Sequence, residues 1–182
     1  AIQREFLLKS LDFADSDDYI CFSDPDEIPR PEIFINFKLK KKYGIFMQKC
    51  FNYKFNLFNN YESPWEGTRA CRKKDLKSID FMRQKVKSKN LRYNFLRFDK
   101  EKSIQLFDNA GWHFNNILSP KEISLKLKTF AHSEFVDEKF SSIDVIKRKI
   151  DEGVDLFDRG HKYQKIAIDE DFPKYLLENL NK

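Results

Sequence analysis

The chain has 182 residues, enough for one domain with a hydrophobic core, and an apolar content of 41% excludes disorder as its main state. Its 34 basic and 29 acidic residues leave a mild surplus of +5, and no apolar run approaches the roughly 18 residues that a membrane helix needs. Five glycines and six prolines exclude collagen-like and low-complexity classes, and three scattered cysteines favour a reducing compartment over a disulfide framework.

The first part of the chain predicts a helix, a strand and a second helix. Apolar residues at helical spacing predict a helix over 1–14. The apolar run 19–22 has no polar alternation, which is typical of a strand buried on both faces in a parallel sheet. Three prolines between 25 and 31 exclude a helix interior or a central strand there. Pro31 is expected to begin a helix that ends at Gly44.

The middle of the chain predicts strands with one helix between them. Residues 44–58 are rich in aromatic side chains that alternate with Asn and Lys, a pattern typical of a half-exposed strand. Residues 65–72 are expected to form a partner strand, and 75–85 a helix. Residues 91–98 and 110–114 are further strand candidates.

The second half of the chain predicts helices. A capping box at 119–122, with Pro120 at the first helical position, begins one helix. Ser141 begins another, which Gly153 closes. A last helix is expected over 172–180. Without a repeat or a linker, the chain is interpreted as one α/β domain over 1–182.

The loop that follows the apolar run 19–22 carries the strongest chemical signal. Asp24, Asp26 and Glu27 place three carboxylates within four residues, where they repel one another unless a cation neutralises them. Oxygen ligands favour hard divalent ions such as Mg²⁺ or Mn²⁺. Open α/β sheets also bind ligands beyond the carboxyl ends of their strands. The alternative is an acidic turn that caps the following helix.

Three other places offer polar side chains that a site requires. His113, beside Trp112, is a metal ligand, a proton carrier or a core residue. Arg69 either holds a phosphate or pairs with an internal carboxylate. His132 and Glu134 follow the capped helix and either reach a site or lie on plain surface. The chain has no Walker loop, dinucleotide-binding glycine motif, nucleophile elbow or zinc motif.

Several blocks resemble one known family, in the same order along the chain. Ser-Asp-Pro-Asp-Glu-Ile-Pro-Arg at 23–30 resembles the Asp-x-Asp-Glu-Ile-Pro signature of the family 17 glycosyltransferases. Ala-Gly-Trp-His at 110–113, followed by Ser-Pro-x-Glu-Ile at 119–123, is similar to a second family block. Residues 153–158 and 173–176 are similar to the family's tail. The resemblance therefore extends over nearly the whole chain.

The resemblance implies a fold and an activity. The expected fold is α/β, a GT-A-like, Rossmann-type mixed sheet flanked by helices, without the N-terminal strand–helix part that family members carry before the position of Ala1. The implied activity is metal-dependent, inverting transfer of N-acetylglucosamine or a related sugar from a UDP-sugar, UDP-N-acetylglucosamine first, to a glycan hydroxyl. We expect a cytoplasmic enzyme, or a Golgi-lumenal one if it is like the animal members.

The resemblance also assigns residues to the donor and its metal. It implies that Asp24 and Asp26 bind Mn²⁺ or Mg²⁺ and the donor diphosphate, with Asp26 as the direct ligand. His113 is implied to complete the metal shell. Arg4, in a Gln-Arg pair like that of the family, is implied to contact the nucleotide. Arg69 remains the candidate for a donor phosphate on the strength of its charge.

The acceptor side is assigned less fully. Trp112 is implied to stack on a sugar, and Glu27 either contacts substrate or caps the next turn. An inverting transfer also needs a carboxylate base that takes the acceptor proton. Glu134 and Asp158 are the candidates for that base.

Two alternatives remain open at this point. Lysine and arginine clusters at 38–42, 72–74 and 85–89 suit a basic module that binds nucleic acid or another polyanion, with the acidic loop structural. A degenerate transferase domain that only binds glycans is the other. Under the enzyme hypothesis the partners are a nucleotide-sugar and a glycan, with no nucleic acid and no membrane segment in this chain.

Overall fold

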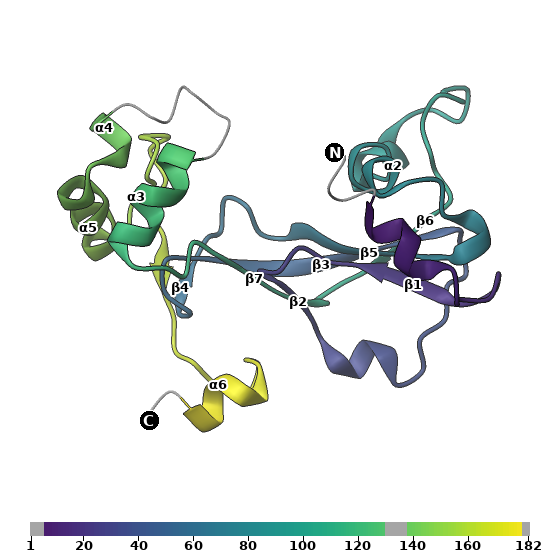
Figure 1. The fold of residues 1–182 in the computed structure, drawn as a ribbon, viewed down its shortest axis with the longest axis horizontal. Helices are drawn as coiled ribbons and strands as arrows, with labels where there is room; N and C mark the ends of the chain where they lie inside the picture. The colour runs from purple at the N-terminus through teal and green to yellow at the C-terminus, as the bar shows by residue number, and fades with distance from the viewer. Residues whose placement is uncertain (1–5, 130–137, 180–182) are drawn as a thin grey trace. The chain divides into compact units, whose positions relative to one another are not determined.

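The computed structural model describes residues 6–129 and 138–179. The chain forms two compact units (Figure 1). Unit 1 comprises Ala1–Gln48 and Pro64–His113, and unit 2 comprises Lys49–Ser63 and Phe114–Lys182.

Unit 1 is built on β-structure with both antiparallel and parallel pairs. Its strands are β1 (Tyr19–Phe22), β2 (Glu27–Pro29), β5 (Trp65–Arg72), β6 (Ile104–Phe107) and parts of β3 (Tyr43–Asn52) and β7 (Gly111–Asn115). Strand β5 pairs antiparallel with both β1 and β3, and β3 pairs parallel with β6. Strand β2 pairs antiparallel with β7. The pairing is therefore mixed, as expected for an α/β chain.

The β3 residues of unit 1 are buried on both faces. Successive side chains of a strand point to opposite faces, so Ile45 and Phe46 enter different hydrophobic clusters. The Ile45 cluster includes Met82 of helix α2 (Ile79–Gln84). The Phe46 cluster is covered by Ile33 and Phe37, from the segment that holds the 3-10 helix η2 (Pro31–Phe34). These two clusters also contain Ala70 and Cys71 of β5, and Tyr19 at the start of β1 packs against the Phe46 cluster.

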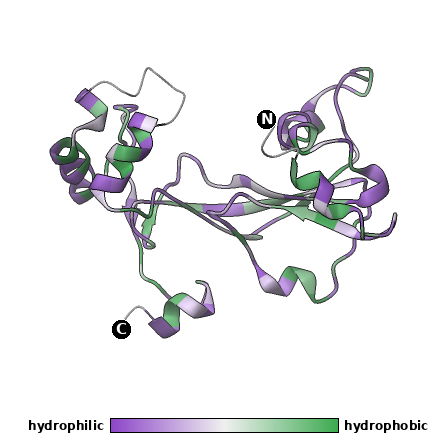
Figure 2. Ribbon diagram, in the orientation of Figure 1, coloured by the Kyte–Doolittle hydropathy of each residue, from purple (hydrophilic) through white to green (hydrophobic). Residues whose placement is uncertain are grey.

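Two helices of unit 2 contribute to a hydrophobic cluster. Its helices are α3 (Pro120–Thr129), α4 (Glu138–Ser141), α5 (Ile143–Glu152) and α6 (Lys174–Asn179), and its short strands are β4 (Leu57–Phe58) and β8 (Gln164–Lys165). Strand β4 pairs antiparallel with β3 and with β8. The cluster joins Ile123 of α3, Ile146 and Ile150 of α5, and Leu57 of β4. Helices α3 and α5 each carry both hydrophobic and hydrophilic residues, as amphipathic helices do (Figure 2).

Several sequence predictions are confirmed. Strand β5 covers 65–72, and β7 begins within the predicted 110–114. Helices α2, α3, α5 and α6 lie where helices were expected, although α5 begins at Ile143 and not at Ser141. Gly153 adopts a left-handed φ of 66° and ends α5 as predicted.

The two N-terminal helix predictions hold only in part. Within the described part of 1–14, Phe6 is α-helical and the 3-10 helix η1 (Leu7–Leu11) follows it, so the helical segment ends at Leu11. The segment after Pro31 forms only the four-residue η2, and Gly44 lies inside β3 rather than at a helix end. Proline suits the first turn of a helix. After that turn, Phe37 packs against the Phe46 cluster from a segment that is not helical.

Three strand predictions also need correction. Strand β1 exists, but it is an antiparallel edge strand with Cys21 exposed, not a strand buried on both faces in a parallel sheet. The half-exposed strand 44–58 is instead the buried β3 and the short β4, because Tyr53 takes a φ of 66° and the chain reverses there. Residues 91–98 form the end of the 3-10 helix η4 (Ser88–Arg92) and a loop, and β6 was not predicted.

The fold is thus mixed α/β, with a mixed set of strand pairs and helices beside them. The remaining 3-10 helix is η3 (Lys73–Asp75). Over residues 6–129 and 138–179, no helix has both the length and the apolar character that crossing a bilayer requires.

Candidate functional site

The acidic loop of unit 1 joins the end of β1 to the start of β2. The loop is closed by two hydrogen bonds between its ends: Glu27 N–H donates to Asp24 O (2.9 Å), and Asp24 N–H donates to Glu27 Oε2 (3.1 Å). Glu27 therefore holds the loop's shape with its own carboxylate. This geometry puts Asp24 and Asp26 on a turn of defined shape.

Glu27 is a buried carboxylate whose two oxygens both accept hydrogen bonds from the protein. Its side chain is about 5% exposed. Oε1 accepts from Trp65 Nε1 on β5 at 2.9 Å, while Oε2 serves the loop. The structure thus gives Glu27 a positioning role, close to the expected alternative that it caps the next turn.

Asp26 and His113 come together although 87 positions separate them in the sequence. His113 lies opposite Glu27 in the β2–β7 register, one residue from Asp26. The Asp26 Oδ2 to His113 Nε2 distance is 3.4 Å. The Trp65 ring stacks on the imidazole with centroids 4.4 Å apart, and His113 is buried. Of the residues assigned to the metal by resemblance, these two lie within reach of one ion.

Asp24 has a different neighbour. Its Oδ2 forms an ion pair with Arg83 Nη1 of helix α2, and both side chains are mostly buried. Arg83 was not a sequence candidate, since it lies 59 positions from Asp24 and in no recognisable motif. Arg83 therefore neutralises the charge of the Asp24 carboxylate without a metal ion.

Arg69 is buried in unit 1 and donates hydrogen bonds to other residues of that unit. Its guanidinium donates to Glu66 Oε2 at 3.1 Å and to the backbone oxygens of Glu66 and Gly67. Burial lowers the pKa of Arg69, while neighbouring carboxylates led by Glu66 oppose that shift. Glu66 in turn accepts from the backbone and hydroxyl of Ser88. Between the two expected roles of Arg69, this arrangement supports the internal pair over phosphate binding.

Trp112 lies next to His113 on β7, but its ring is covered. It is about 2% exposed, and the Arg30 guanidinium carbon lies 4.4 Å from the ring centroid. Arg30 is held there by Asn109, whose backbone oxygen accepts from Arg30 Nε at 2.9 Å. Stacking of Trp112 on a sugar, as the resemblance implies, would require Arg30 to move. Trp112 Nε1 has no hydrogen-bond partner in the described part of the chain.

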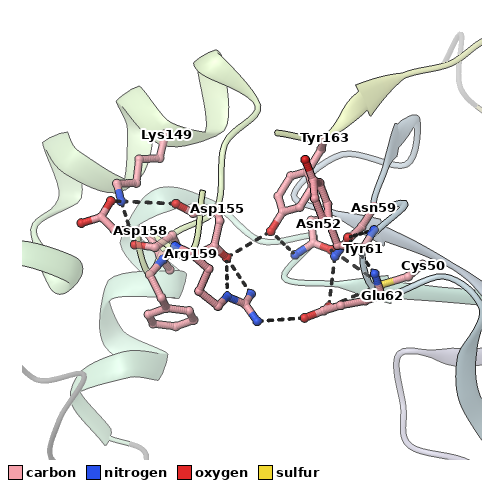
Figure 3. A network of polar contacts seen from close by, with 12 residues as sticks. Cys50, Asn52, Asn59, Tyr61, Glu62, Lys149, Asp155, Asp158, Arg159 and Tyr163 are labelled. Atoms are coloured by element: carbon pink, nitrogen blue, oxygen red, sulfur yellow. Dashed lines mark hydrogen bonds and ion pairs between the residues drawn. The ribbon is translucent and has the colours of Figure 1, made fainter. Parts of the chain in front are cut away.

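Asp158 belongs to a polar network of unit 2 (Figure 3). It pairs with Lys149 and with Lys139, the latter at 3.0 Å. Hydrogen bonds from these two lysines, Lys149 first, lower the pKa of the Asp158 carboxyl. A carboxylate with a lowered pKa is a weaker general base at neutral pH. The other base candidate, Glu134, and the nucleotide candidate Arg4 lie outside the described residues, as does His132.

The same network contains a buried carboxylate that the sequence analysis missed. Asp155 is about 3% exposed and accepts from Arg159, from Tyr163 Oη, and from two backbone N–H groups. Arg159 continues to Glu62 at 3.0 Å, so the network joins two segments of unit 2 (Figure 3). Its groups satisfy one another, which is typical of a structural network.

Comparisons with protein families, with curated proteins and with solved structures found no match to this chain. Within residues 6–129 and 138–179, no three His, Cys, Asp or Glu side chains form a group that could hold a metal ion. The candidate site in unit 1 is therefore a pair of potential ligands, Asp26 and His113, beside an acidic loop and Arg83.

Proposed function

We propose that the chain is a metal-dependent glycosyltransferase that moves N-acetylglucosamine or a related sugar from a UDP-sugar to a glycan hydroxyl. The observation that carries the proposal is the approach of Asp26 to His113 in unit 1. The family resemblance assigns both residues to one metal, and the chain folds so that their potential ligand atoms are neighbours. The GT-A-like strand arrangement is part of this proposal.

The separation of the two atoms suits a shared ion. Ligand atoms at about 2.1 Å from a metal and at roughly right angles to each other are about 3 Å apart. Asp26 Oδ2 and His113 Nε2 are 3.4 Å apart, close to that value. A carboxylate favours a hard ion such as Mg²⁺ or Mn²⁺. Mg²⁺ is commonly held by one or two carboxylates plus substrate phosphates, so Asp26 and a diphosphate would supply the oxygen ligands of such a site and His113 a nitrogen ligand.

The surroundings of the pair suit a bound diphosphate. Arg83 lies at Asp24, where it can be shared between that carboxylate and a phosphate oxygen. The burial of Lys87 and its proximity to Arg69 lower its pKa, while Glu66 opposes the shift. Lys87 thus belongs to the same group of charges as Arg69 and Glu66. In such an enzyme the metal stabilises the charge that develops on the leaving diphosphate.

The protein's own residues have defined tasks under this proposal. Glu27 and Trp65 hold the acidic loop against β7, which fixes the Asp26 carboxylate beside the imidazole. Arg30 keeps the face of Trp112 covered until a ligand displaces it. The two lysine pairs of Asp158 argue against that residue as the base that takes the acceptor proton.

The test is UDP release from UDP-sugars with Mn²⁺ present and with it chelated, in this chain and in the longest open reading frame that contains it. We expect Asp26→Asn to lower metal-dependent turnover on the order of 100-fold and to leave the fold intact. Asp12→Asn is the matched control, since Asp12 is an exposed residue of the same unit. Binding of Mn²⁺ in the presence of UDP, followed by electron paramagnetic resonance, should weaken in Asp26→Asn and in His113→Gln.

Two results would overturn the proposal. Full activity in Asp26→Asn would remove the metal role of the pair. Absence of turnover and of UDP-dependent Mn²⁺ binding in the folded chain and in the longer reading frame would instead favour the polyanion-binding module or the degenerate domain. In those cases the Asp24–Arg83 pair and the bonds of Glu27 would be purely structural.

A further inference from the structure

The loop formed by residues 91–98 exposes an unusual concentration of large hydrophobic side chains. Phe95, Leu96 and Phe98 are 76%, 60% and 87% exposed, and Leu91 and Tyr93 are more than two-fifths exposed. Soluble proteins expose hydrophobic residues singly, whereas several together mark an interaction surface. We call residues 91–98 the apolar loop.

The apolar loop has a defined shape despite its exposure. The side chain of Asn94 accepts from Leu96 N–H at 3.1 Å, and its backbone oxygen accepts from Arg97 N–H at 3.0 Å. Arg97 forms a two-point pair with Asp99 at 2.7 and 2.8 Å. These local hydrogen bonds fix the turn, and Phe95 and Leu96 are exposed on it. A partner could therefore cover their apolar area without a change in the structure of the loop.

The charge around the apolar loop is mainly positive. Residues 85–102 contain seven lysines and arginines against two acidic residues, a surplus of five that equals the surplus of the whole chain. The rest of the chain therefore has no net charge. Lys77, Lys85 and Lys100 line a hollow of about 410 Å³ together with Phe81, Phe98, Asp99 and Glu101. Basic groups thus outnumber acidic ones at a place where apolar groups also meet on unit 1.

We propose that unit 1 docks on the surface of an anionic lipid bilayer through the apolar loop. Phe95, Leu96 and Phe98 enter the boundary between head groups and acyl chains, and exposed basic residues of 85–102, Lys89 and Arg92 among them, contact lipid phosphates. Aromatic and aliphatic side chains beside lysine and arginine are typical of segments that lie in a membrane interface. This inference does not depend on the proposed transferase activity.

The composition of the apolar loop favours lipid over nucleic acid. Aromatic rings also stack on bases, and basic residues also bind nucleic acid phosphates. Leucine has no π face, however, and Leu96 stands at the tip between Phe95 and Arg97. A leucine offers a base neither a stacking face nor a hydrogen-bond group, whereas it gains free energy when it is buried among acyl chains.

The test is co-sedimentation with vesicles of phosphatidylcholine alone and of equal parts phosphatidylcholine and phosphatidylglycerol. We expect binding to the anionic vesicles only. Phe95→Ser with Phe98→Ser should weaken it on the order of 100-fold, as expected for two aromatic side chains kept in water. Phe13→Ser is the matched control, because Phe13 is also 87% exposed and lies in unit 1.

A second pair of variants tests the charge. Lys89→Gln with Arg92→Gln should weaken binding to anionic vesicles by about 30-fold at low salt. Lys147→Gln with Arg148→Gln removes the same charge from exposed positions of α5 and should leave binding unchanged. All four residues are exposed, so thermal unfolding of the variants should match that of the parent chain.

Three results would overturn the inference. Vesicle binding that is unchanged by the Phe95 and Phe98 substitutions would show charge attraction without insertion. Binding of oligonucleotides, lost in the loop variants and without vesicle binding, would assign the surface to nucleic acid. Self-association that disappears with the phenylalanines, again without vesicle binding, would assign it to a second copy of the chain.

Discussion

Glu27 offers the sharpest test of the loop geometry, because one substitution removes both hydrogen bonds that its carboxylate accepts. In Glu27→Ala the Trp65 indole N–H and the Asp24 backbone N–H lose their acceptor. A buried donor left without a partner costs about 1–3 kcal/mol. Both donors lie in partly buried surroundings, so we expect the free energy of unfolding of unit 1 to fall by about 3 kcal/mol in total.

Urea unfolding followed by tryptophan fluorescence measures this change. The chain has two tryptophans, Trp65 and Trp112, and both lie in unit 1, so the signal reports that unit. We expect a lower midpoint and an unchanged slope. Glu32→Ala removes an exposed carboxylate of the same unit and should change the free energy of unfolding by less than about 0.5 kcal/mol.

A double-mutant cycle separates the bond from the rest of the effect. Glu27→Ala and Trp65→Phe, alone and combined, should show a coupling energy of about 2 kcal/mol, as for a hydrogen bond to a charged group. A coupling energy near zero, or Glu27→Ala as stable as the parent chain, would refute the positioning role. It would return Glu27 to the substrate contact that the family resemblance implies.

Two further predictions concern the interior of each unit. In Gly67→Ala the new Cβ would lie 1.9 Å from Oε1 of the fully buried Gln48, so the variant should lose about 1–3 kcal/mol in the same urea assay. In unit 2, burial opposes ionisation of Asp155, but hydrogen bonds from Arg159 outweigh it and lower the pKa of Asp155 from 3.8 to about 2. Because the folded-state pKa is the lower one, the ionised carboxyl contributes about 2 kcal/mol above pH 4, which is lost as the pH falls toward 2. The stability difference between the parent chain and Asp155→Asn, measured by circular dichroism at several pH values, should shrink over that range, and a constant difference would contradict the assignment.

Local sequence signals predicted the elements that depend on local bonds. The capping box at Ser119 forms as expected, with Glu122 Oε2 accepting from Ser119 N–H at 2.8 Å. Gly153 ends α5 in the left-handed conformation that glycine favours. In both cases the residues that form the bonds lie within a few positions of one another, so a single sequence contains the whole signal.

Elements that depend on distant partners were not predictable in this way. The aromatic-rich alternation at 91–98 is the same for a half-exposed strand and for a loop that exposes its hydrophobic residues. Strand β3 is buried on both faces because separate segments cover Ile45 and Phe46. The Arg83 partner of Asp24 also lies on another element, and no spacing in the sequence connects them. The approach of Asp26 to His113 was expected only because two blocks resembled one family.

The distribution of charge makes the two proposals separable in a single set of measurements. Outside 85–102 the chain has no net charge, and its acidic loop would repel a diphosphate unless a cation bridges them. Binding of UDP should therefore require Mn²⁺ and disappear on chelation. Docking on anionic vesicles rests on lysine, arginine and exposed phenylalanine, so it should be indifferent to chelation and weaken as salt screens the phosphates. Asp26→Asn should abolish only the first behaviour and the Phe95–Phe98 double substitution only the second, since neither variant changes a residue on which the other depends.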